Sequence, residues 1–554
     1  MATPADTGRH APLDFVTLHP VAFTCLLCLA WLIPGLVGHD PWKPDEAYSF
    51  GLVYHMLQTG DWVVPTLAGE PFMEKPPLYY ITAALFARGF GWLLPLHDAA
   101  RLASGFYMAL TFLLVGLSAR ELHGGRKGWV AVLILLGSVG LIERAHQLLT
   151  DVSQLTGFAL ALYGLALSLR RPVLGGVGLG AGVGIAFMSK GLLAPGCFGL
   201  LCIVLPAIFP IWRTRNYIKT LAVAALAIAP FLLVWPWLLY QRSPELFQEW
   251  LWTNNFGRFL GRNQLGPKSV PGQYLGILIW YAMPAWPLAT WAVWSKRREL
   301  RYTPGLHLPL TAFLVIFTVL SVSRDARDLY AMPMLVPLAL LAVPGLLTLR
   351  RGASNALLWF SVLFFAFFLL VGWFYWIALD GEIPARLHRH LLRMQPGYTP
   401  SFSWSESGLA LLYTSGWVYI LLRTRRTAER PIVFWAVGAT MVWGLLLILF
   451  VDYADVGKSY RSMTLAIQAA LPKKYDCISS YNLGEPQRAL LQYFAGIVTY
   501  RETEPSRKRE CHVLLVQGFR NYILVPNPDA HWRRIWEGAR PGDDKELFQL
   551  YERK

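Results

Sequence analysis

The chain has 554 residues, of which 55% are hydrophobic and only 15% charged, and its mean hydropathy is +0.40. A soluble chain carries about a quarter charged residues, so this composition excludes an ordinary soluble globular protein and predicts a membrane protein. The formal net charge of +16 would by itself suggest nucleic-acid binding. The basic residues, however, fall mainly in short loops between apolar blocks, a pattern that orients membrane proteins and argues against a nucleic-acid partner.

Apolar blocks close to the length of a membrane-spanning helix recur along the chain. We place them at 16–38, 101–120, 128–143, 151–170, 173–189, 192–211, 217–241, 273–294, 306–322, 328–348, 354–379, 408–422 and 431–452. Trp and Tyr gather at their ends, which is typical of membrane–water interfaces. The first block exceeds the apolar core of a signal peptide and lacks a cleavage pattern, so we expect a retained anchor helix.

Basic clusters between these blocks predict the orientation. They are Arg120/Arg126/Lys127, Arg170/Arg171, Arg213/Arg215/Lys219, Lys296/Arg297/Arg298/Arg301, Arg350/Arg351 and Arg423/Arg425/Arg426. If the N-terminus is cytoplasmic and the thirteen blocks cross in alternation, every cluster falls on the cytoplasmic side. A crossing by the further apolar stretch 78–94 would break this agreement. We therefore predict that this stretch is a re-entrant or interfacial helix on the outer face.

Four segments then face outward: loops 39–100, 242–272 and 380–407, and a tail. We predict a transmembrane domain over 1–451 and a soluble outer α/β domain over 452–554, which is long enough to form its own core. In the tail, the runs 477–481, 497–500 and 511–516 predict buried strands, and helices are expected near 460–471 and 486–494. Cys477 and Cys511 either pair, as an oxidising outer compartment allows, or stay free.

The first outer loop carries the most chemistry. It contains Lys43-Pro-Asp-Glu-Ala-Tyr-Ser49, Thr59-Gly-Asp-Trp-Val-Val-Pro65 and Gly69-Glu-Pro-Phe-Met-Glu-Lys-Pro-Pro-Leu-Tyr-Tyr80. The adjacent carboxylates of Asp45 and Glu46 can act as a base, bind a divalent cation or hold a cationic or hydroxylated substrate. Asp45 suits a helix N-cap equally well. The prolines after Glu74-Lys75 hold the chain extended, and a lysine fixed there is suited to bind a lipid phosphate.

The order of these motifs resembles the polyprenyl-phosphate-dependent glycosyltransferases of the GT-C fold. The branch it resembles most contains the protein mannosyltransferase-like enzymes and the lipid A 4-amino-4-deoxy-L-arabinose transferases. The resemblance implies a polytopic α-helical GT-C membrane protein with about 13 transmembrane helices and a small C-terminal α/β periplasmic domain. Among these relatives, thirteen spans followed by such a domain are most similar to the aminoarabinose transferases.

The resemblance also implies roles for individual residues. By position in the motifs, Lys75, Arg258 and the Tyr330 hydroxyl bind the lipid phosphate, although an interfacial arginine and a belt tyrosine are ordinary alternatives. Asp45 is implied as the catalytic carboxylate, with Asp151 and Glu74 as further candidates. Other candidates are Glu46, Tyr48, Lys190 and Asn255.

The acceptor decides what the carboxylates do. With a hydroxyl acceptor, Asp45 would serve as general base. With a lipid A phosphate, the nucleophile is already anionic, and the carboxylates of Asp45 and Glu74 would hold a cationic amino sugar or a metal ion. The relatives carry His where this chain has Asn255, which removes a possible metal ligand. We therefore expect no required cofactor, with a divalent metal at Glu74 and Asp45 as an open alternative.

The predicted function is inverting transfer of 4-amino-4-deoxy-L-arabinose from undecaprenyl phosphate to lipid A on the periplasmic side of the bacterial inner membrane, with a role in polymyxin resistance. The expected partners are the undecaprenyl-phosphate-linked sugar, lipid A or another periplasmic acceptor, and membrane lipids, and we expect a monomer. The alternative is transfer of mannose or another hexose to protein or polysaccharide. A lipid transporter would show internal repeats with broken helices, which the sequence lacks. A non-catalytic scaffold would leave the Glu74-Lys75 loop unexplained.

Overall fold

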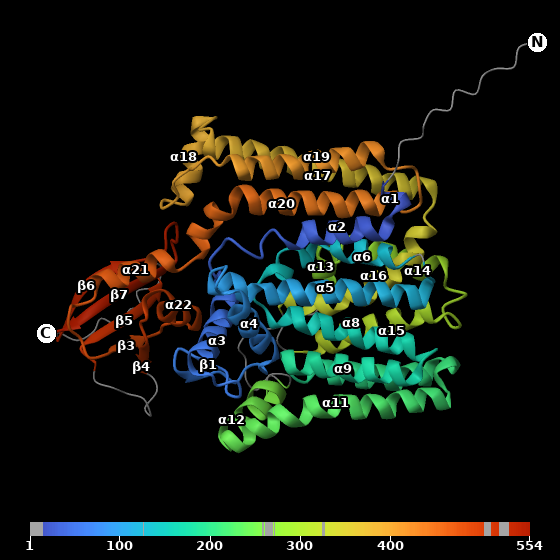
Figure 1. Ribbon diagram of the computed structural model, residues 1–554, viewed down its shortest axis with the longest axis horizontal. Coiled ribbons are helices and arrows are strands. Elements are labelled where there is room, and N and C mark those ends of the chain that lie inside the picture. Colours follow the sequence, from blue (N-terminus) through green and yellow to red (C-terminus); the bar gives the residue numbers. More distant parts are fainter. Residues whose placement is uncertain are drawn as a thin grey trace, which may run out of the picture.

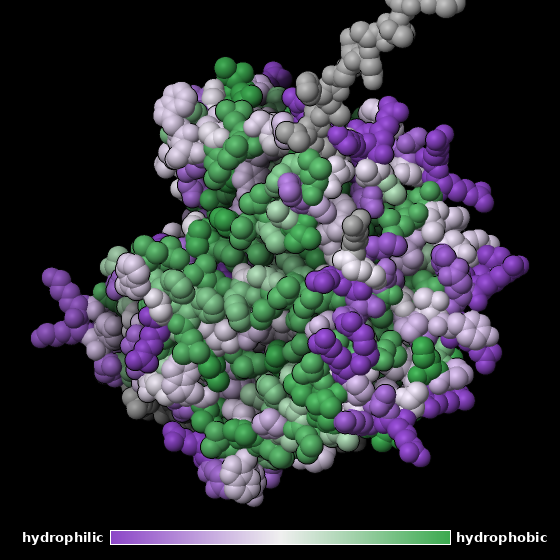
Figure 2. Space-filling view, turned by 45° about the vertical axis from the view of Figure 1, so that its right-hand side comes forward, coloured by the Kyte–Doolittle hydropathy of each residue, from purple (hydrophilic) through white to green (hydrophobic). Residues whose placement is uncertain are grey.

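The computed structural model describes residues 15–125, 127–257, 260, 270, 272–323, 327–502, 511–519 and 531–554. Long helices lie side by side in a bundle, and a small sheet domain sits at one end of it (Figure 1). Hydrophobic side chains cover much of the bundle surface in Figure 2, and hydrophilic side chains gather mainly toward the end that comes forward in that view. This distribution is expected of a bundle surrounded by lipid.

Every predicted apolar block forms helix. The helices of the bundle are α1 (Phe15–Leu18), α2 (Pro20–Leu32), α5 (Leu96–His123), α6 (Gly128–Leu136), α7 (Val139–Ile142), α8 (Thr150–Ser168), α9 (Pro172–Lys190), α10 (Leu193–Ile208), α11 (Arg215–Arg242), α13 (Gln273–Tyr281), α14 (Ala285–Ser295), α15 (Pro304–Val322), α16 (Met332–Leu347), α17 (Arg351–Asp380), α19 (Trp404–Arg423) and α20 (Arg430–Lys458). Short connecting helices are η1 (Arg144–His146), η2 (Pro210–Trp212), the π-helix η3 (Glu249–Gly257) and η4 (Asp328–Ala331).

The structure does not confirm the predicted count of thirteen crossings. Among the described residues, seven helices are long and apolar enough to span a bilayer, or up to nine if each bent pair counts as one span. The bent pairs fall in blocks 128–143 and 273–294, which break by 77° and 102°. Helix α2 ends at Leu32, well short of residue 38. Hydropathy reports whether a segment prefers lipid, but it does not report where the helix breaks within that segment.

Helices α3 (Asp45–Thr59), α4 (Leu78–Phe90) and α12 (Pro244–Gln248) lie at the end of the bundle that faces the sheet domain (Figure 1). Helix α4 has 13 residues, about 20 Å at 1.5 Å per residue, which is shorter than the roughly 30 Å hydrocarbon layer. This length agrees with the prediction that the stretch 78–94 does not cross. Strands β1 (Thr66–Leu67) and β2 (Glu70–Pro71) form a small antiparallel hairpin between α3 and α4, which the sequence did not predict.

The C-terminal domain has the predicted α/β character. Its sheet has the order β4-β3-β5-β7-β6, with β3 parallel to β4 and β5, and β7 antiparallel to β5 and β6. The strands are β3 (Ile478–Tyr481), β4 (Thr499–Arg501), β5 (Val513–Phe519), β6 (Trp532–Gly538) and β7 (Glu546–Arg553). The helices α21 (Arg461–Ala470) and α22 (Glu485–Ala495) lie close to the predicted positions. Strands β6 and β7 were not predicted, because their apolar residues are interrupted by charges.

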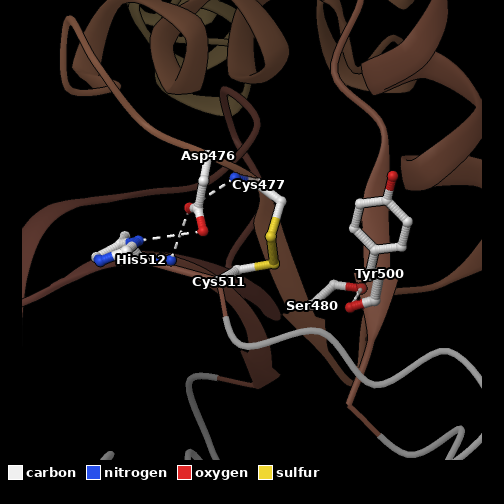
Figure 3. Close-up of a disulfide and its surroundings, with 6 residues drawn as sticks. All are labelled: Asp476, Cys477, Ser480, Tyr500, Cys511 and His512. Atoms are coloured by element: carbon white, nitrogen blue, oxygen red, sulfur yellow. Dashed lines mark hydrogen bonds and ion pairs between the residues drawn. A yellow bond between two sulfur atoms is a disulfide. The ribbon is translucent and has the colours of Figure 1, made fainter.

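Cys477 and Cys511 form a disulfide, which decides between the two alternatives left open above (Figure 3). The bond joins the residues that precede the paired strands β3 and β5. Beside it, the Asp476 carboxylate accepts hydrogen bonds from the backbone N–H groups of His512 and Cys477, and these bonds lower the pKa of Asp476 to about 2. Helix α20 runs to Lys458, past the predicted domain boundary at 452, and so leads directly into this domain.

Candidate active site

Helix α3 brings Asp45 to the end of the bundle. Asp45 is the first residue of α3, and its Oδ1 lies 3.8 Å from Nη1 of Arg327, the residue before η4. The N-cap position belongs to Pro44, so Asp45 is not the N-cap that its sequence context allowed. A carboxylate in the first turn of a helix is stabilised by the helix dipole. Asp45 therefore lies beside a guanidinium at the start of α3.

Lys75 reaches the same place from the loop before α4. Its Nζ donates a hydrogen bond of 2.6 Å to the hydroxyl of Tyr48, one turn along α3 from Asp45. Burial alone would lower the pKa of Lys75, but surrounding acidic groups, among them the carboxylates of Asp151 and Asp45, raise it above its usual value. Burial and the same acidic groups raise the pKa of Tyr48 well above 10. The pair is thus an ammonium held by a neutral phenol.

A second cation comes from the neighbouring helices. Lys190 is the last residue of α9 and forms an ion pair with Asp151, in the first turn of α8. Its Nζ also lies 4.1 Å from the centre of the Tyr330 ring, a cation–π contact. The other oxygen of Asp151, Oδ2, is buried and has no hydrogen-bond partner among the described residues. The structure therefore brings Asp151, Lys190 and Tyr330, predicted separately, into one cluster.

A cavity of about 360 Å³ opens beside these groups. Its polar wall consists of Glu74, Lys75, Lys190, Asn254, Asn255, Ser323 and Tyr330. Its apolar wall consists of Leu192, Leu193, Gly196, Phe256, Val319 and Leu320. Two ammonium groups next to an apolar wall are suited to a ligand that has an anionic head and a hydrocarbon tail.

Asn255 has a structural role beside the cavity. Its Nδ2 donates to the backbone carbonyl of Trp250 at 2.8 Å, and its Oδ1 accepts from the backbone N–H of Leu192 at 3.3 Å. Gly191 lies against this side chain with a φ of +77°, and a Cβ at position 191 would collide with Oδ1 of Asn255. The glycine of Met188-Ser-Lys-Gly191 is thus required by this close approach and by its backbone conformation.

Glu46 lies outside the cavity, although it was a candidate site residue. Its carboxylate is buried and pairs with Nε of Arg101 at 2.6 Å. It also accepts hydrogen bonds from the backbone N–H groups of Trp42 at 3.0 Å and Leu148 at 3.2 Å. Glu46 therefore ties the start of α3 to α5 and to the chain before α8. It fixes the position of its neighbour Asp45.

Two features of the prediction receive no geometric support. Arg258, the third predicted phosphate ligand, lies outside the described residues, as do Arg126 and 324–326. Among the residues that are described, no group of three or more His, Cys, Asp or Glu side chains is arranged to hold a metal ion. A metal at Glu74 and Asp45 stays a prediction, and no step below depends on one.

The C-terminal domain reaches the site, which the sequence did not predict. Arg488 on α22 is buried and binds Glu70 through both oxygens, at 2.7 and 2.5 Å, and Nε of Arg501 lies 3.2 Å from the same carboxylate. Burial and the nearby Glu74 raise the pKa of Glu485, at the start of α22. Helix α22 also packs on α3 at Gly51. The domain therefore clamps the loop that carries Glu74 and Lys75.

Removing this clamp should loosen the loop. We expect Arg488→Gln to increase amide hydrogen exchange over residues 66–77 by at least about tenfold, because the partly buried Glu70 carboxylate would lose its bidentate partner. The measurement is hydrogen-exchange mass spectrometry of the full chain. The exchanged pair Glu70→Arg/Arg488→Glu should recover part of the protection, and the exposed Arg553→Gln serves as control. Unchanged exchange in Arg488→Gln would show that the clamp does not hold the loop.

Comparisons with known proteins show which proteins this chain is similar to in sequence. Residues 74–238 match the family described as dolichyl-phosphate-mannose-protein mannosyltransferase. The undecaprenyl phosphate-alpha-4-amino-4-deoxy-L-arabinose arabinosyl transferase of Pseudomonas aeruginosa (strain UCBPP-PA14) is 33% identical over 59% of this chain and 60% of the relative. Its counterpart in Serratia proteamaculans (strain 568) is 26% identical over 78% of this chain and 76% of the relative. The match thus spans about 60% of the length of the Pseudomonas relative.

Solved structures agree over more of the chain. ArnT from Cupriavidus metallidurans bound to undecaprenyl phosphate has a TM-score of 0.72 at 18% identity, covering 96% of this chain and 98% of ArnT. The apo oligosaccharyltransferase of Archaeoglobus fulgidus has a TM-score of 0.53 at 11% identity, covering 89% of this chain and 65% of that protein. The fold is therefore that of the GT-C membrane glycosyltransferases, as predicted. In sequence, the chain is similar to the undecaprenyl phosphate aminoarabinosyl transferases, which confirms the predicted resemblance.

Proposed function

We propose that this protein transfers 4-amino-4-deoxy-L-arabinose from undecaprenyl phosphate to a phosphate group of lipid A. The observation that carries the proposal is the cavity in which the ammonium groups of Lys75 and Lys190 meet an apolar wall. A relative whose name includes this donor is 33% identical over 59% of this chain, and ArnT bound to undecaprenyl phosphate has the same fold. In the proposed orientation, the N-terminus is cytoplasmic and the cavity and C-terminal domain are periplasmic, in the inner membrane.

The reaction follows from the charges around the cavity. An oxygen of the acceptor phosphate attacks the anomeric carbon of the sugar, and the bond from that carbon to the undecaprenyl phosphate oxygen breaks. The bonding electrons leave with the lipid phosphate, and Lys75 stabilises the charge that develops there. Attack from the opposite face inverts the anomeric carbon.

The carboxylates have a different task in this reaction. The acceptor phosphate is already anionic, so no base has to remove a proton from it. Glu74 lines the cavity, and the carboxylates of Asp45 and Glu74 both raise the pKa of Lys75. We assign them to attract the ammonium group of the amino sugar. With a hydroxyl acceptor instead, Asp45 would act as the general base.

Mass spectrometry of lipid A tests this proposal. Cells with and without the protein are compared, and we expect pentosamine-modified lipid A phosphate only where the intact protein is present. Asp45→Asn should abolish the modification, and the exposed Asp544→Asn should retain it. Unmodified lipid A together with hexose on protein or polysaccharide would overturn the proposal in favour of hexosyl transfer. An assay of the purified chain with each polyprenyl-phosphate sugar identifies the donor independently.

A further inference from the structure

Helix α18 (Ala385–Met394) lies at the end of the bundle that also carries α3, α4 and the sheet (Figure 1). Leu391 is buried against the end of α17, and the Tyr453 hydroxyl donates a hydrogen bond of 2.9 Å to the Leu391 carbonyl. Nδ1 of His388 lies 3.1 Å from the carbonyl oxygen of Ala378. One face of this helix is thereby fixed to the bundle.

The opposite face is basic. Its exposed side chains follow helical spacing i, i+3, i+4 and i+7 and are Arg386, Arg389, His390 and Arg393. In the part of the chain that the structure describes, no carboxylate forms an ion pair with these three arginines. Other exposed arginines at this end do have such partners: Arg461 pairs with Asp40, and Arg533 pairs with Glu552 at 2.8 Å. The α18 arginines therefore present positive charge that no carboxylate of the described residues neutralises.

Apolar side chains flank the basic face. Ile383 and Met394, at the two ends of α18, are 69% and 53% exposed, and Trp404 at the start of α19 is 84% exposed. A basic helix bordered by exposed apolar side chains is typical of a segment that lies in the headgroup region of a bilayer. This combination suits a partner with anionic headgroups and acyl chains.

A short series of contacts joins α18 to the active site. The carbonyl of Met394 lies so close to Gly542 that a Cβ at that position would collide with it. The next residue, Asp543, binds Nζ of Lys43 at 3.3 Å. Lys43 is two residues before Asp45. The basic face and the proposed catalytic carboxylate are thus linked through the rim of the C-terminal domain.

We infer that α18 is the docking surface for the phosphate groups of the acceptor glycolipid in the outer leaflet. This inference rests on the proposed function, because it assigns the acceptor of that reaction. Arg386 and Arg393 are seven residues apart, about 10 Å along the helix axis. That length accommodates two phosphate groups on one molecule, as in a bisphosphorylated glycolipid, better than the single phosphate of a phospholipid. Arginine also suits phosphate through bidentate hydrogen bonds.

Binding without any sugar donor tests this inference separately from the reaction. Native mass spectrometry of the full chain in detergent is performed with bisphosphorylated lipid A, with dephosphorylated lipid A and with phosphatidylglycerol. We expect selective retention of bisphosphorylated lipid A. Arg386→Gln/Arg389→Gln/Arg393→Gln should weaken this binding at least about tenfold, since each basic residue contributes to attraction of anionic lipid. The matched triple lysine variant should lose less, because it keeps the charge.

The outcomes separate the two proposals. Arg297→Gln/Arg298→Gln/Arg301→Gln removes three arginines outside α18 and should bind lipid A like the unmodified protein. Equal lipid A binding by the α18 glutamine variant would overturn the inference, and so would equal retention of phosphatidylglycerol or dephosphorylated lipid A. Normal, α18-dependent lipid A binding in a protein that transfers no aminoarabinose would overturn the proposed function and leave the docking surface in place.

Discussion

Replacing Lys75 by alanine is expected to reduce turnover of the polyprenyl-phosphate sugar by about a hundredfold or more. Lys75 lines the cavity, and its ammonium group is held by Tyr48 at 2.6 Å. A preorganised cation placed where a leaving phosphate gains charge acts mainly in the transition state, and loss of one such group costs about 10²–10³ in rate. The measurement is the initial rate of donor consumption by the purified protein, with the thermal midpoint recorded in parallel.

Two further variants make the Lys75 result specific. Lys75→Arg keeps the charge but changes its geometry, so it should retain more activity than alanine and less than the unmodified protein. Lys473→Ala removes an exposed lysine of the C-terminal domain and should leave the rate unchanged. Near-normal turnover by Lys75→Ala with an unchanged thermal midpoint would exclude the phosphate role of Lys75. Loss of turnover together with a large fall in the midpoint would instead assign Lys75 a structural role.

The second large effect is expected at Arg101, which lies away from the cavity. Its side chain is fully buried and pairs with Glu46 at 2.6 Å and with Asp98 at 2.5 Å. Arg101→Met would leave two buried carboxylates without their cation, and breaking a buried ion pair costs about 3–5 kcal/mol. We expect a clearly lower thermal midpoint in detergent and reduced activity, because Asp45 follows the position of Glu46 at the start of α3.

Two variants serve as controls for Arg101→Met: one breaks an exposed ion pair, and the other removes both partners of the buried pair. Arg170→Met breaks an exposed ion pair with Glu121 and should change the midpoint little, since exposed pairs contribute about 0–1 kcal/mol. Glu46→Gln/Arg101→Met should be less destabilised than the sum of the two single variants, because the two side chains interact directly. Additive effects, or an Arg101→Met midpoint equal to that of Arg170→Met, would contradict this account.

The same ion pair should make stability depend on pH. Burial alone would raise the pKa of Glu46, but Arg101 and His39 outweigh it and hold that pKa below its usual range. A carboxylate whose pKa is depressed in the folded state stabilises the fold above its unfolded pKa, about 4.3 for Glu. This stabilisation is lost as the pH falls through the lower, folded value. The midpoint of the unmodified protein should therefore fall on acidification, and that of Glu46→Gln should fall less.

Much of the fold could be read directly from the sequence. Each apolar block forms helix, because transfer of apolar side chains into lipid depends on composition within about twenty residues. In the tail, α21 and α22 begin and end within a few residues of the predicted positions. Strands β3 and β5 coincide with short apolar runs that turn residues bound. The Glu74-Lys75 loop was predicted to be extended, because prolines restrict the backbone locally, but the structure has bends at Glu74 and Lys75.

The sequence also named most of the residues that line the site, but it could not show their partners. Lys190, Asp151 and Tyr330 were separate candidates, and only packing of α8, α9 and η4 brings them together. Glu46 looked equivalent to Asp45, yet the two side chains diverge: one lies beside Arg327 and the other is buried on Arg101. Adjacent helical residues point about 100° apart, so the direction of each depends on what surrounds the helix.

The sequence by itself thus determined the membrane class, the helical segments, the α/β tail and the loop that carries Lys75. Only the tertiary structure decided that Cys477 pairs with Cys511, that two of the predicted apolar blocks are bent, and that Arg488 of the C-terminal domain binds Glu70 in the first outer loop. The physical reason is the range of the interactions. Hydropathy and backbone restriction act over neighbouring residues, whereas the contact between Glu70 and Arg488 joins positions 418 residues apart and exists only once the helices have packed.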